Sequence, residues 1–166
     1  MKKLIVVNGT MGVGKTKTCK ELNKRLKNSV WLDGDWCWKM NPFIVNEENK
    51  KMVKENIAFL LNNFLNNSNL ENIIFNWVIH DEQILDDILE MISNKDFQLK
   101  KITLICSRKV LKRRISSDIA KGKKDIECLE RSLKYFDLYE DMDTEKIDTS
   151  EMATEEIVEE VMKLIE

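Results

Sequence analysis

The sequence predicts an α/β fold in three layers, with a parallel sheet of five strands and helices on both of its faces. Short apolar runs rich in β-branched residues alternate with longer segments in which apolar residues recur at helical spacing. Such alternation is typical of parallel strands joined by right-handed helical crossovers. The first apolar run also ends in a glycine-rich loop that leads into a helical pattern, as a βα unit requires. Ligands of such sheets bind at the carboxyl ends of the strands.

The predicted elements follow one another in βα order. Strands are expected at residues 4–8, 29–32, 72–78, 99–106 and 146–148. Helices are expected at about residues 15–28, 47–65, 84–92, 107–120, 125–138 and 154–164. Ser107 and Thr154 are the residue types that cap helix N-termini, so we expect them to begin the fourth and the last helix.

Length and composition favour a single globular domain that spans residues 1–166. The chain is 43% hydrophobic and 34% charged, and its net charge of −2 gives no general attraction to nucleic acid or anionic membranes. A nucleic-acid partner is therefore unsupported. The first apolar run, residues 4–8, is too short for a signal peptide or a membrane span, so we expect a cytosolic protein.

The cysteines and the single histidine argue against zinc. The four cysteines lie on separate predicted elements without C-x-x-C spacing, which favours reduced thiols over disulfides or a zinc site. Because His80 is the only histidine, a histidine-rich metal site is excluded.

Residues 9–16 match the phosphate-binding pattern G-x-x-x-x-G-K-[ST], between a predicted strand and a predicted helix. Glycines let successive backbone N–H groups point inward, and the helix N-terminus attracts anions. Lys15 is expected to reach the β- and γ-phosphates, and the Thr16 hydroxyl to help hold Mg²⁺. We therefore predict that the chain binds ATP with Mg²⁺. The expected nucleotide contacts of the loop are Gly9, Met11, Gly12, Val13, Gly14, Lys15, Thr16 and Lys17.

Two carboxylates follow the second predicted strand, in the segment Asp33-Gly34-Asp35. They fall at the ligand edge of the sheet, and their spacing in an extended chain sends both to the same side. We predict that Asp33 helps to place Mg²⁺, while Asp35 accepts the proton of the acceptor hydroxyl. The alternative is an acidic turn that caps the next helix.

A basic segment follows the fourth strand and is predicted to form a lid at about residues 108–125. Eight cations lie in it, namely Arg108, Lys109, Lys112, Arg113, Arg114, Lys121, Lys123 and Lys124. Such a segment can close over a triphosphate and stabilise the transferring phosphoryl group. Arg113 and Lys121 are the preferred members, and Arg131 is a further candidate; the alternative is a solvated basic face.

Aromatic residues near the predicted strand ends suggest an acceptor pocket. Trp36, Trp38 and Trp77 are expected to line it, whereas Trp31 lies inside a strand and is expected in the core. His80 is a further candidate contact. The alternative is that these residues serve packing, with His80 incidental at a helix start.

Asn76 stands where many phosphate-loop proteins carry an acid at the end of a strand. Asp33 or Asp81 must then take over the metal-placing duty. Asp81 also suits the start of the following helix, where a carboxylate complements the helix dipole.

Together these segments resemble the P-loop small-molecule and nucleotide kinases. The similarity is closest to shikimate- and gluconate-kinase-like proteins, and to chloramphenicol phosphotransferase and tunicamycin-resistance ATP-binding proteins. It implies a three-layer αβα P-loop NTPase fold with a short lid. It further implies that Asp33 places Mg²⁺, Asp35 contacts the acceptor and Arg113 packs on adenine. The other side of the adenine pocket would be formed by Asp148, Thr149 and Ser150.

The chain departs from this group at three points. Lys17 replaces a hydroxyl residue that touches the α-phosphate, residues 73–80 lack the glycine cluster of shikimate kinases, and no arginine stands near Asp35. Shikimate is therefore disfavoured as the acceptor.

The predicted function is ATP- and Mg²⁺-dependent phosphotransfer to a small acceptor bearing a hydroxyl or phosphate, such as a nucleotide, a sugar-like metabolite or an antibiotic. The alternative is an ATP-binding switch or resistance-type protein that hydrolyses ATP slowly to control a partner. A GTPase switch is disfavoured because no N-K-x-D motif is present. The sequence leaves the oligomeric state open.

Overall fold

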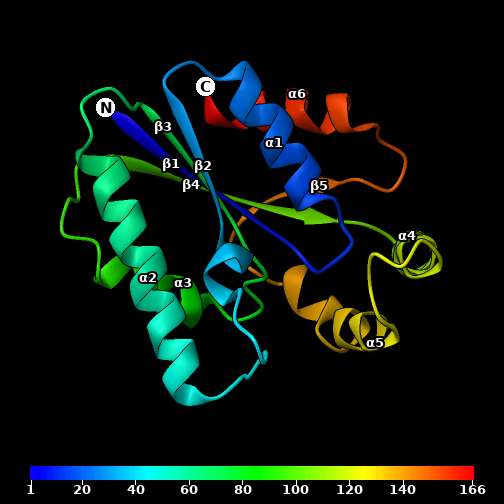
Figure 1. Ribbon diagram of the computed structural model, residues 1–166. Coiled ribbons are helices and arrows are strands. Elements are labelled where there is room, and N and C mark those ends of the chain that lie inside the picture. Colours follow the sequence, from blue (N-terminus) through cyan, green and yellow to red (C-terminus); the bar gives the residue numbers. More distant parts are fainter.

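The five strands form one parallel sheet. The computed structural model describes all of residues 1–166. Its strands are β1 (Lys2–Asn8), β2 (Ser29–Asp33), β3 (Asn72–Asn76), β4 (Phe97–Ile105) and β5 (Glu145–Asp148). They lie in the order β2-β3-β1-β4-β5, and every neighbouring pair is parallel (Figure 1). The predicted sheet is confirmed.

Helices cover both faces of this sheet. They are α1 (Lys15–Arg25), α2 (Glu47–Asn66), α3 (Glu82–Glu90), α4 (Arg108–Ala120), α5 (Ile126–Lys134) and α6 (Thr154–Ile165). Along β1, Ile5 and Val7 pack into the core with α1 and α6, whereas Leu4 and Val6 pack with α2 and α3. Because β1 is buried on both faces, it is a continuous apolar run rather than an alternating one.

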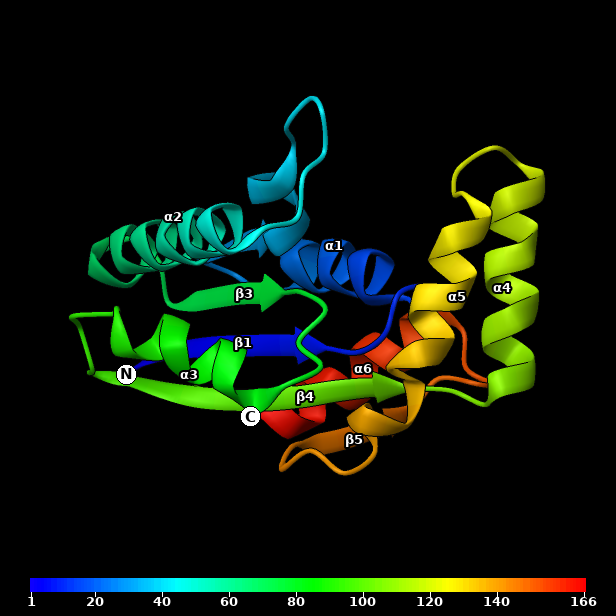
Figure 2. The ribbon, with the colours of Figure 1, turned by 90° about the horizontal axis from the view of Figure 1, so that it is seen from below.

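The α4–α5 hairpin stands beside the carboxyl ends of the strands. In Figure 2 the arrowheads of β3, β1 and β4 all point toward this hairpin. The apolar side of α4, with Val110, Leu111 and Ile115, belongs to the same core as α1 and α6. A short helical turn, η2 (Phe136–Tyr139), leads from α5 toward β5. The predicted lid segment thus borders the ligand edge of the sheet.

Most predicted boundaries lie within three residues of the observed ones, and three differences concern how an element begins, ends or divides. Ser107 caps α4 as expected, since its hydroxyl accepts a hydrogen bond from Val110 N at 3.2 Å. Thr154 was expected to cap α6, but it is the first residue of that helix and Ala153 precedes it at the cap position. There the Glu156 carboxylate accepts the Ala153 N–H at 2.6 Å, which satisfies that N–H from within the helix.

The other two differences concern length. The third strand ends at Asn76 instead of residue 78, and the helix predicted for residues 125–138 divides into α5 and η2. None of the helices is both long and apolar enough to cross a lipid bilayer.

Candidate active site

The glycine-rich loop, Gly9–Thr16, is shaped by close packing against β4 and α4. Gly9 has φ 141°, and a Cβ there would lie 2.5 Å from the Leu104 carbonyl oxygen. A Cβ on Gly12 would lie 2.6 Å from a side-chain carbon of Ile115. These glycines are therefore required by space as well as by backbone conformation. Gly14 is the N-cap residue of α1, so the last two residues of the loop, Lys15 and Thr16, already lie in the first turn of that helix.

Lys15 is buried beneath this loop. Its Nζ donates hydrogen bonds to the carbonyl oxygens of Gly9 at 2.7 Å and Thr10 at 2.9 Å. Burial lowers the pKa of Lys15 to about 8, although the nearby carboxylates of Asp35 and Asp33 act in the opposite direction. The loop thus holds a cation whose charge is poorly solvated and well placed to attract an anion.

Thr16 and Asp33 join the glycine-rich loop to the acidic segment. The Thr16 hydroxyl donates a hydrogen bond to Asp33 Oδ2 at 3.2 Å, and Asp33 Oδ1 accepts the Asp35 N–H at 3.0 Å. The second bond caps the short helical turn η1 (Gly34–Trp38). The predicted cap and the predicted metal-placing position are therefore the same residue, and the two interpretations do not exclude each other.

A hydroxyl and a carboxylate at this distance suit Mg²⁺, which prefers oxygen ligands and binds to few protein groups when phosphates and water complete its octahedral shell. Thr16 and Asp33 are the residues that would hold it. Asp81, the alternative, caps α3 by accepting the Gln83 N–H at 3.0 Å. Asn76 accepts a hydrogen bond from Trp31 Nε1 at 2.5 Å, so it helps to fix a tryptophan of the edge strand.

Asp35 is the exposed acid of the pair. Partial loss of water around the Asp35 carboxyl and the nearby charge of Asp33 raise the pKa of Asp35. Lys15 and a hydrogen bond from Trp77 act in the opposite direction. Trp77 lies directly against Gly34, where an added Cβ would come within 2.5 Å of the indole ring. The acidic segment Asp33-Gly34-Asp35 therefore needs glycine at its centre, because any side chain there would collide with Trp77.

The predicted acceptor residues lie in different surroundings. Trp36 is 46% exposed and packs on Trp31 at 5.0 Å between ring centroids. Trp38 contacts Phe43, 5.7 Å away, and Trp77 is 8% exposed in the core under α2 and α3. Trp31 is only partly buried against the other core. Trp36 is thus the most accessible aromatic next to Asp35.

His80 faces the base of the α4–α5 hairpin. Its ring stacks on Tyr135 with 4.3 Å between centroids and 23° between planes. Burial lowers the pKa of His80. Tyr135 could not be recognised from the sequence, because this contact joins residues 55 positions apart and no local pattern marks it.

Arg114, rather than its neighbour Arg113, contacts the glycine-rich loop and the turn after β5. Arg114 donates to Val13 O at 3.3 Å, to Thr149 Oγ1 at 3.0 Å and to Thr149 O at 2.7 Å. Arg113 is exposed on α4 and makes no hydrogen bond. The helical spacing around Leu111 and Ile115, both core residues, could have indicated which of the two arginines faces the loop.

The segment predicted to flank adenine forms a tight turn after β5. Asp148 Oδ1 accepts hydrogen bonds from Ser150 N at 2.9 Å and Ser150 Oγ at 2.6 Å. Thr149 is buried, and Ser150 Oγ accepts the Ser107 N–H at 2.9 Å. The turn is therefore tied to the start of α4, next to Arg114.

The cations of the predicted lid segment and of α5 after it are divided between free and paired ones. Lys121 is exposed and makes no ion pair, whereas Lys124 Nζ lies 3.3 Å from Asp118 and Arg131 lies 3.8 Å from Asp125. Gly122 turns the chain between α4 and α5 with φ 68°.

Lys17 makes no hydrogen bond or ion pair and is exposed at the surface of α1. Thr18, the next hydroxyl, is buried in α1, and its Oγ1 has no hydrogen-bond partner.

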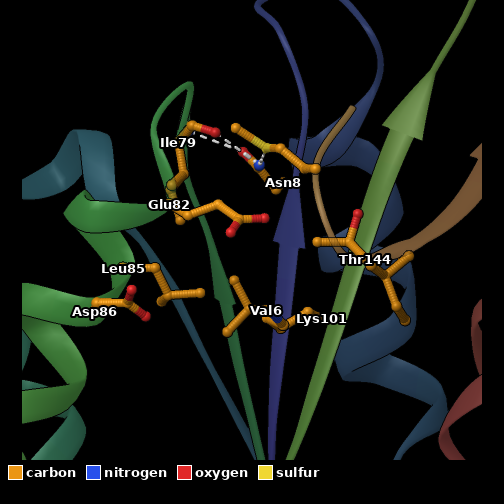
Figure 3. A pocket seen from close by; sticks show the side chains of 10 residues that line it. Val6, Asn8, Ile79, Glu82, Leu85, Asp86, Lys101 and Thr144 are labelled. Carbon is orange, nitrogen blue, oxygen red and sulfur yellow. Dashed lines mark hydrogen bonds between the residues drawn. The ribbon is translucent and has the colours of Figure 1, made fainter. Parts of the chain in front are cut away.

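Asn8 connects β1 to the segment that carries Trp77 and His80. Its amide donates to Ile79 O at 2.7 Å and accepts the Ile79 N–H at 2.8 Å (Figure 3). Figure 3 also shows side chains from α3, β1 and β4 around a shallow hollow that opens to solvent. None of its lining residues belongs to the glycine-rich loop or to η1, so this hollow is not the phosphate site.

Three solved structures resemble the whole chain. A gluconokinase from Sinorhizobium meliloti 1021 has a TM-score of 0.71 and 18% identity, and the match covers 97% of this chain and 90% of that one. A shikimate kinase from Acinetobacter baumannii in complex with shikimate has a TM-score of 0.66 and 16% identity, with 99% of this chain and 93% of that one covered. A tunicamycin resistance protein from Deinococcus radiodurans has a TM-score of 0.64 and 15% identity, with 99% of this chain and 96% of that one covered. The P-loop kinase fold expected from the motifs is confirmed.

A curated relative and a family model match at the level of sequence. The cytidylate kinase of Buchnera aphidicola subsp. Baizongia pistaciae (strain Bp) is 29% identical over 92 residues. That alignment covers 55% of this chain and about 40% of the relative's length. Residues 5–134, most of the chain, match the model of the AAA domain family. The matched range contains the glycine-rich loop, the acidic segment and both helices of the hairpin. The chain therefore belongs to the AAA domain family, with the P-loop at residues 9–16.

Proposed function

We propose that this protein is a P-loop kinase that transfers the γ-phosphoryl group of ATP to a small acceptor. The hydrogen bond between Thr16 and Asp33 carries the proposal, because it places the phosphate-binding loop and the acidic segment in one site. The fold similarity to gluconokinase and shikimate kinase and the sequence match to a cytidylate kinase support the same reaction class.

The residues divide the work as follows. Lys15 leaves the carbonyl oxygens of Gly9 and Thr10 and binds the phosphates of ATP as a point charge. Thr16 and Asp33 would hold Mg²⁺, which supplies charge neutralisation between the β- and γ-phosphates. Asp35 accepts the proton of the acceptor hydroxyl. The acceptor oxygen then bonds to the γ-phosphorus as the bond to the leaving oxygen of ADP breaks.

The hairpin of α4 and α5 is proposed to act as the lid of the same unit, with residues 1–166 working as one kinase domain. Arg114 and the Thr149 segment would border the adenine, and Lys121 and Lys124 would approach the phosphates on closure. Exclusion of water by such a lid favours transfer to the acceptor over hydrolysis.

The test is acceptor-dependent release of ADP. Purified protein with ATP and Mg²⁺ is offered nucleosides, nucleotides, sugars and antibiotics, and ADP is measured by a coupled assay. A kinase releases ADP faster with one acceptor class, in step with a phosphorylated product. If ATP turnover never responds to an acceptor while a protein partner binds only the ATP form, the molecule is a switch and the kinase proposal is wrong.

A further inference from the structure

The acceptor side of the site lacks arginine. The arginines of the chain are Arg25, Arg108, Arg113, Arg114 and Arg131. None lies in residues 26–107, which supply the whole stretch from β2 through η1 and α2 to the start of α3. Arginine is the side chain that binds phosphate and carboxylate groups through two parallel hydrogen bonds. An anionic acceptor would find no such group here.

The lysines next to this stretch are mostly engaged. Lys50 pairs with Glu47 at 2.8 Å, Lys51 with Glu55 at 3.7 Å, and Lys54 with Asp87 at 2.5 Å. Lys39 follows η1 without an acid partner and is exposed. Across the site, Lys134 Nζ lies over the Tyr135 ring at 5.1 Å.

Exposed ion pairs are weak, so pairing alone does not decide the charge of the acceptor. The carboxylates at the ligand edge are the stronger argument about the charge of the acceptor. Asp33 and Asp35 are adjacent at the ligand edge, and Asp81 lies beside His80. A second anion brought next to Asp35 would be repelled, and residues 26–107 hold no arginine to compensate for that repulsion. The two lysines that face Asp35, Lys15 and Lys124, are the ones assigned above to the phosphates of ATP.

Flat apolar surface is what this side offers instead. Trp36, 46% exposed, directly follows Asp35 in the chain, whereas the Trp77 ring, 8% exposed, lies against Gly34 and supports this turn from the core. Trp38 and Phe43 form a second aromatic pair where the chain leaves η1, and Phe43 is 58% exposed. Indole rings give wide apolar contact with a single N–H donor, which suits a planar ring better than a charged group.

The place of Asp35 also points to a hydroxyl. An alcohol must lose its proton as it attacks, so a neighbouring carboxylate accelerates the reaction. A phosphate acceptor is already an anionic nucleophile at neutral pH and gains nothing from such a base.

We propose that the acceptor is an uncharged molecule whose reacting hydroxyl is attached to a flat ring system, as in a nucleoside, and not a phosphorylated or carboxylated compound. This proposal rests on the kinase function proposed above and narrows its acceptor class. The proton of the hydroxyl passes to Asp35, its oxygen takes the γ-phosphoryl group, and ADP leaves with the electron pair of the broken bond.

Matched pairs of acceptors test the charge. Cytidine, uridine, adenosine and guanosine are each compared with the corresponding 5′-monophosphate, and glucose is compared with gluconate as a pair without a flat ring. We expect kcat/KM at least about tenfold higher for one or more nucleosides than for the matching monophosphate, and lower values for glucose and gluconate, which both lack a flat ring. If a monophosphate or gluconate is used as well as or better than its neutral partner, the inference is overturned while the kinase function stands. If no acceptor of either charge raises ADP release, both fail.

A pair of variants tests the aromatic surface. Trp36→Ala should raise KM for the neutral acceptor about tenfold, as expected when one stacking contact is lost, and leave KM for ATP unchanged. Phe59→Ala is the matched control, because Phe59 is a 66% exposed aromatic on α2 that has no place in the proposed site. An unchanged acceptor KM in Trp36→Ala would remove the aromatic part of the inference. An equal effect in Phe59→Ala would show a general loss of structure and would count against it as well.

Discussion

The donor side and the acceptor side of this site are built in different ways. The glycine-rich loop consists of backbone groups packed so tightly against β4 and α4 that a single Cβ at Gly9 or Gly12 has no room. The acceptor side consists of exposed side chains on a short helical turn and a loop, with Trp36 and Phe43 about half accessible. A rigid backbone cradle suits one invariant group, the triphosphate, whereas side chains on a loop can be changed to fit different acceptors.

The largest expected effect is on the donor side, in Lys15→Ala. Removal of the buried cation should weaken ATP binding and lower turnover by about 10²-fold or more, the scale of losing one preorganised electrostatic contact. Binding is measured by calorimetry and turnover by ADP release. Lys17→Ala is the matched control, because Lys17 is the exposed lysine two positions away. If the two variants behave alike, the loop does not use Lys15 as proposed.

Asp35→Asn should separate the two sides. Turnover should fall by about 10²-fold through loss of the base, with ATP affinity nearly intact. The acid side of the pH–rate profile of the wild type reports the raised pKa of Asp35, and this limb should disappear in the variant. Unchanged turnover would remove Asp35 from the mechanism.

Asp35→Asn should also change the thermal stability of the protein, in a direction that follows from the raised pKa of Asp35. Because the folded state raises the pKa of Asp35, the protonated form favours folding, and this stability is lost as pH rises from the ordinary value of 3.8 through the raised one. Asp35→Asn should therefore melt at a higher temperature than the wild type at neutral pH. The difference should vanish in acid below that ordinary value, as followed by thermal unfolding at several pH values.

Arg114→Gln should perturb the donor side less strongly. It removes the hydrogen bonds to Val13 and Thr149, so we expect KM for ATP to rise about tenfold and the free energy of unfolding to fall by about 1–3 kcal/mol. Arg113→Gln provides the comparison, since Arg113 is exposed on the same helix. A larger rise in KM for ATP in Arg113→Gln would instead support Arg113 as the residue that packs on adenine.

Gly34→Ala tests whether the acceptor side also contains a tightly packed point. The new methyl group would meet the Trp77 ring, and overpacking of this kind lowers the free energy of unfolding by about 1–3 kcal/mol. Gly122→Ala has open space around its Cβ and should lose only about 1 kcal/mol, from its left-handed conformation. Denaturant unfolding of both variants gives the comparison, and equal losses would contradict close packing at Gly34.

The smallest expected effect is the number of protons that the protein takes up when it binds ATP. Lys15 has a pKa of about 8, so part of the population is neutral near that pH, and the phosphates of ATP should favour its charged form. ATP binding should therefore take up protons between about pH 7 and 9, as measured by calorimetry in buffers of different ionisation enthalpy. Lys15→Ala should abolish this uptake; an unchanged uptake would assign it to another group.

Much of the donor side could be predicted from the sequence. The strand, loop and helix around residues 9–16 are local features, because glycine spacing, an apolar run and helical periodicity are each set by neighbours in the chain. The same holds for the cap formed by Ser107 and for the approximate place of Asp33 at a strand end. Thr154 was expected at the cap position of α6, but Ala153 occupies that position, and its N–H is accepted by the Glu156 carboxylate of the first helical turn.

The contacts that complete the site could not be predicted in this way, since they join distant parts of the chain. The Arg114 side chain reaches Thr149, and His80 meets Tyr135, only because the sheet aligns the carboxyl ends of β3, β4 and β5 along the same edge. The spacing from Leu111 and Ile115 indicates the side of α4 on which Arg114 lies, but only the tertiary structure shows that this side meets the loop and Thr149.

By itself, the sequence determined the parallel α/β sheet, the phosphate-binding loop and the two carboxylates at its edge, because each depends on short-range spacing and backbone conformation. Tertiary structure alone decided that Thr16 bonds to Asp33, that Trp77 closes on Gly34, and that Arg114 reaches Thr149. The physical reason is that hydrogen bonds and charges act over a few ångströms in space, and the fold fixes which residues come within that distance.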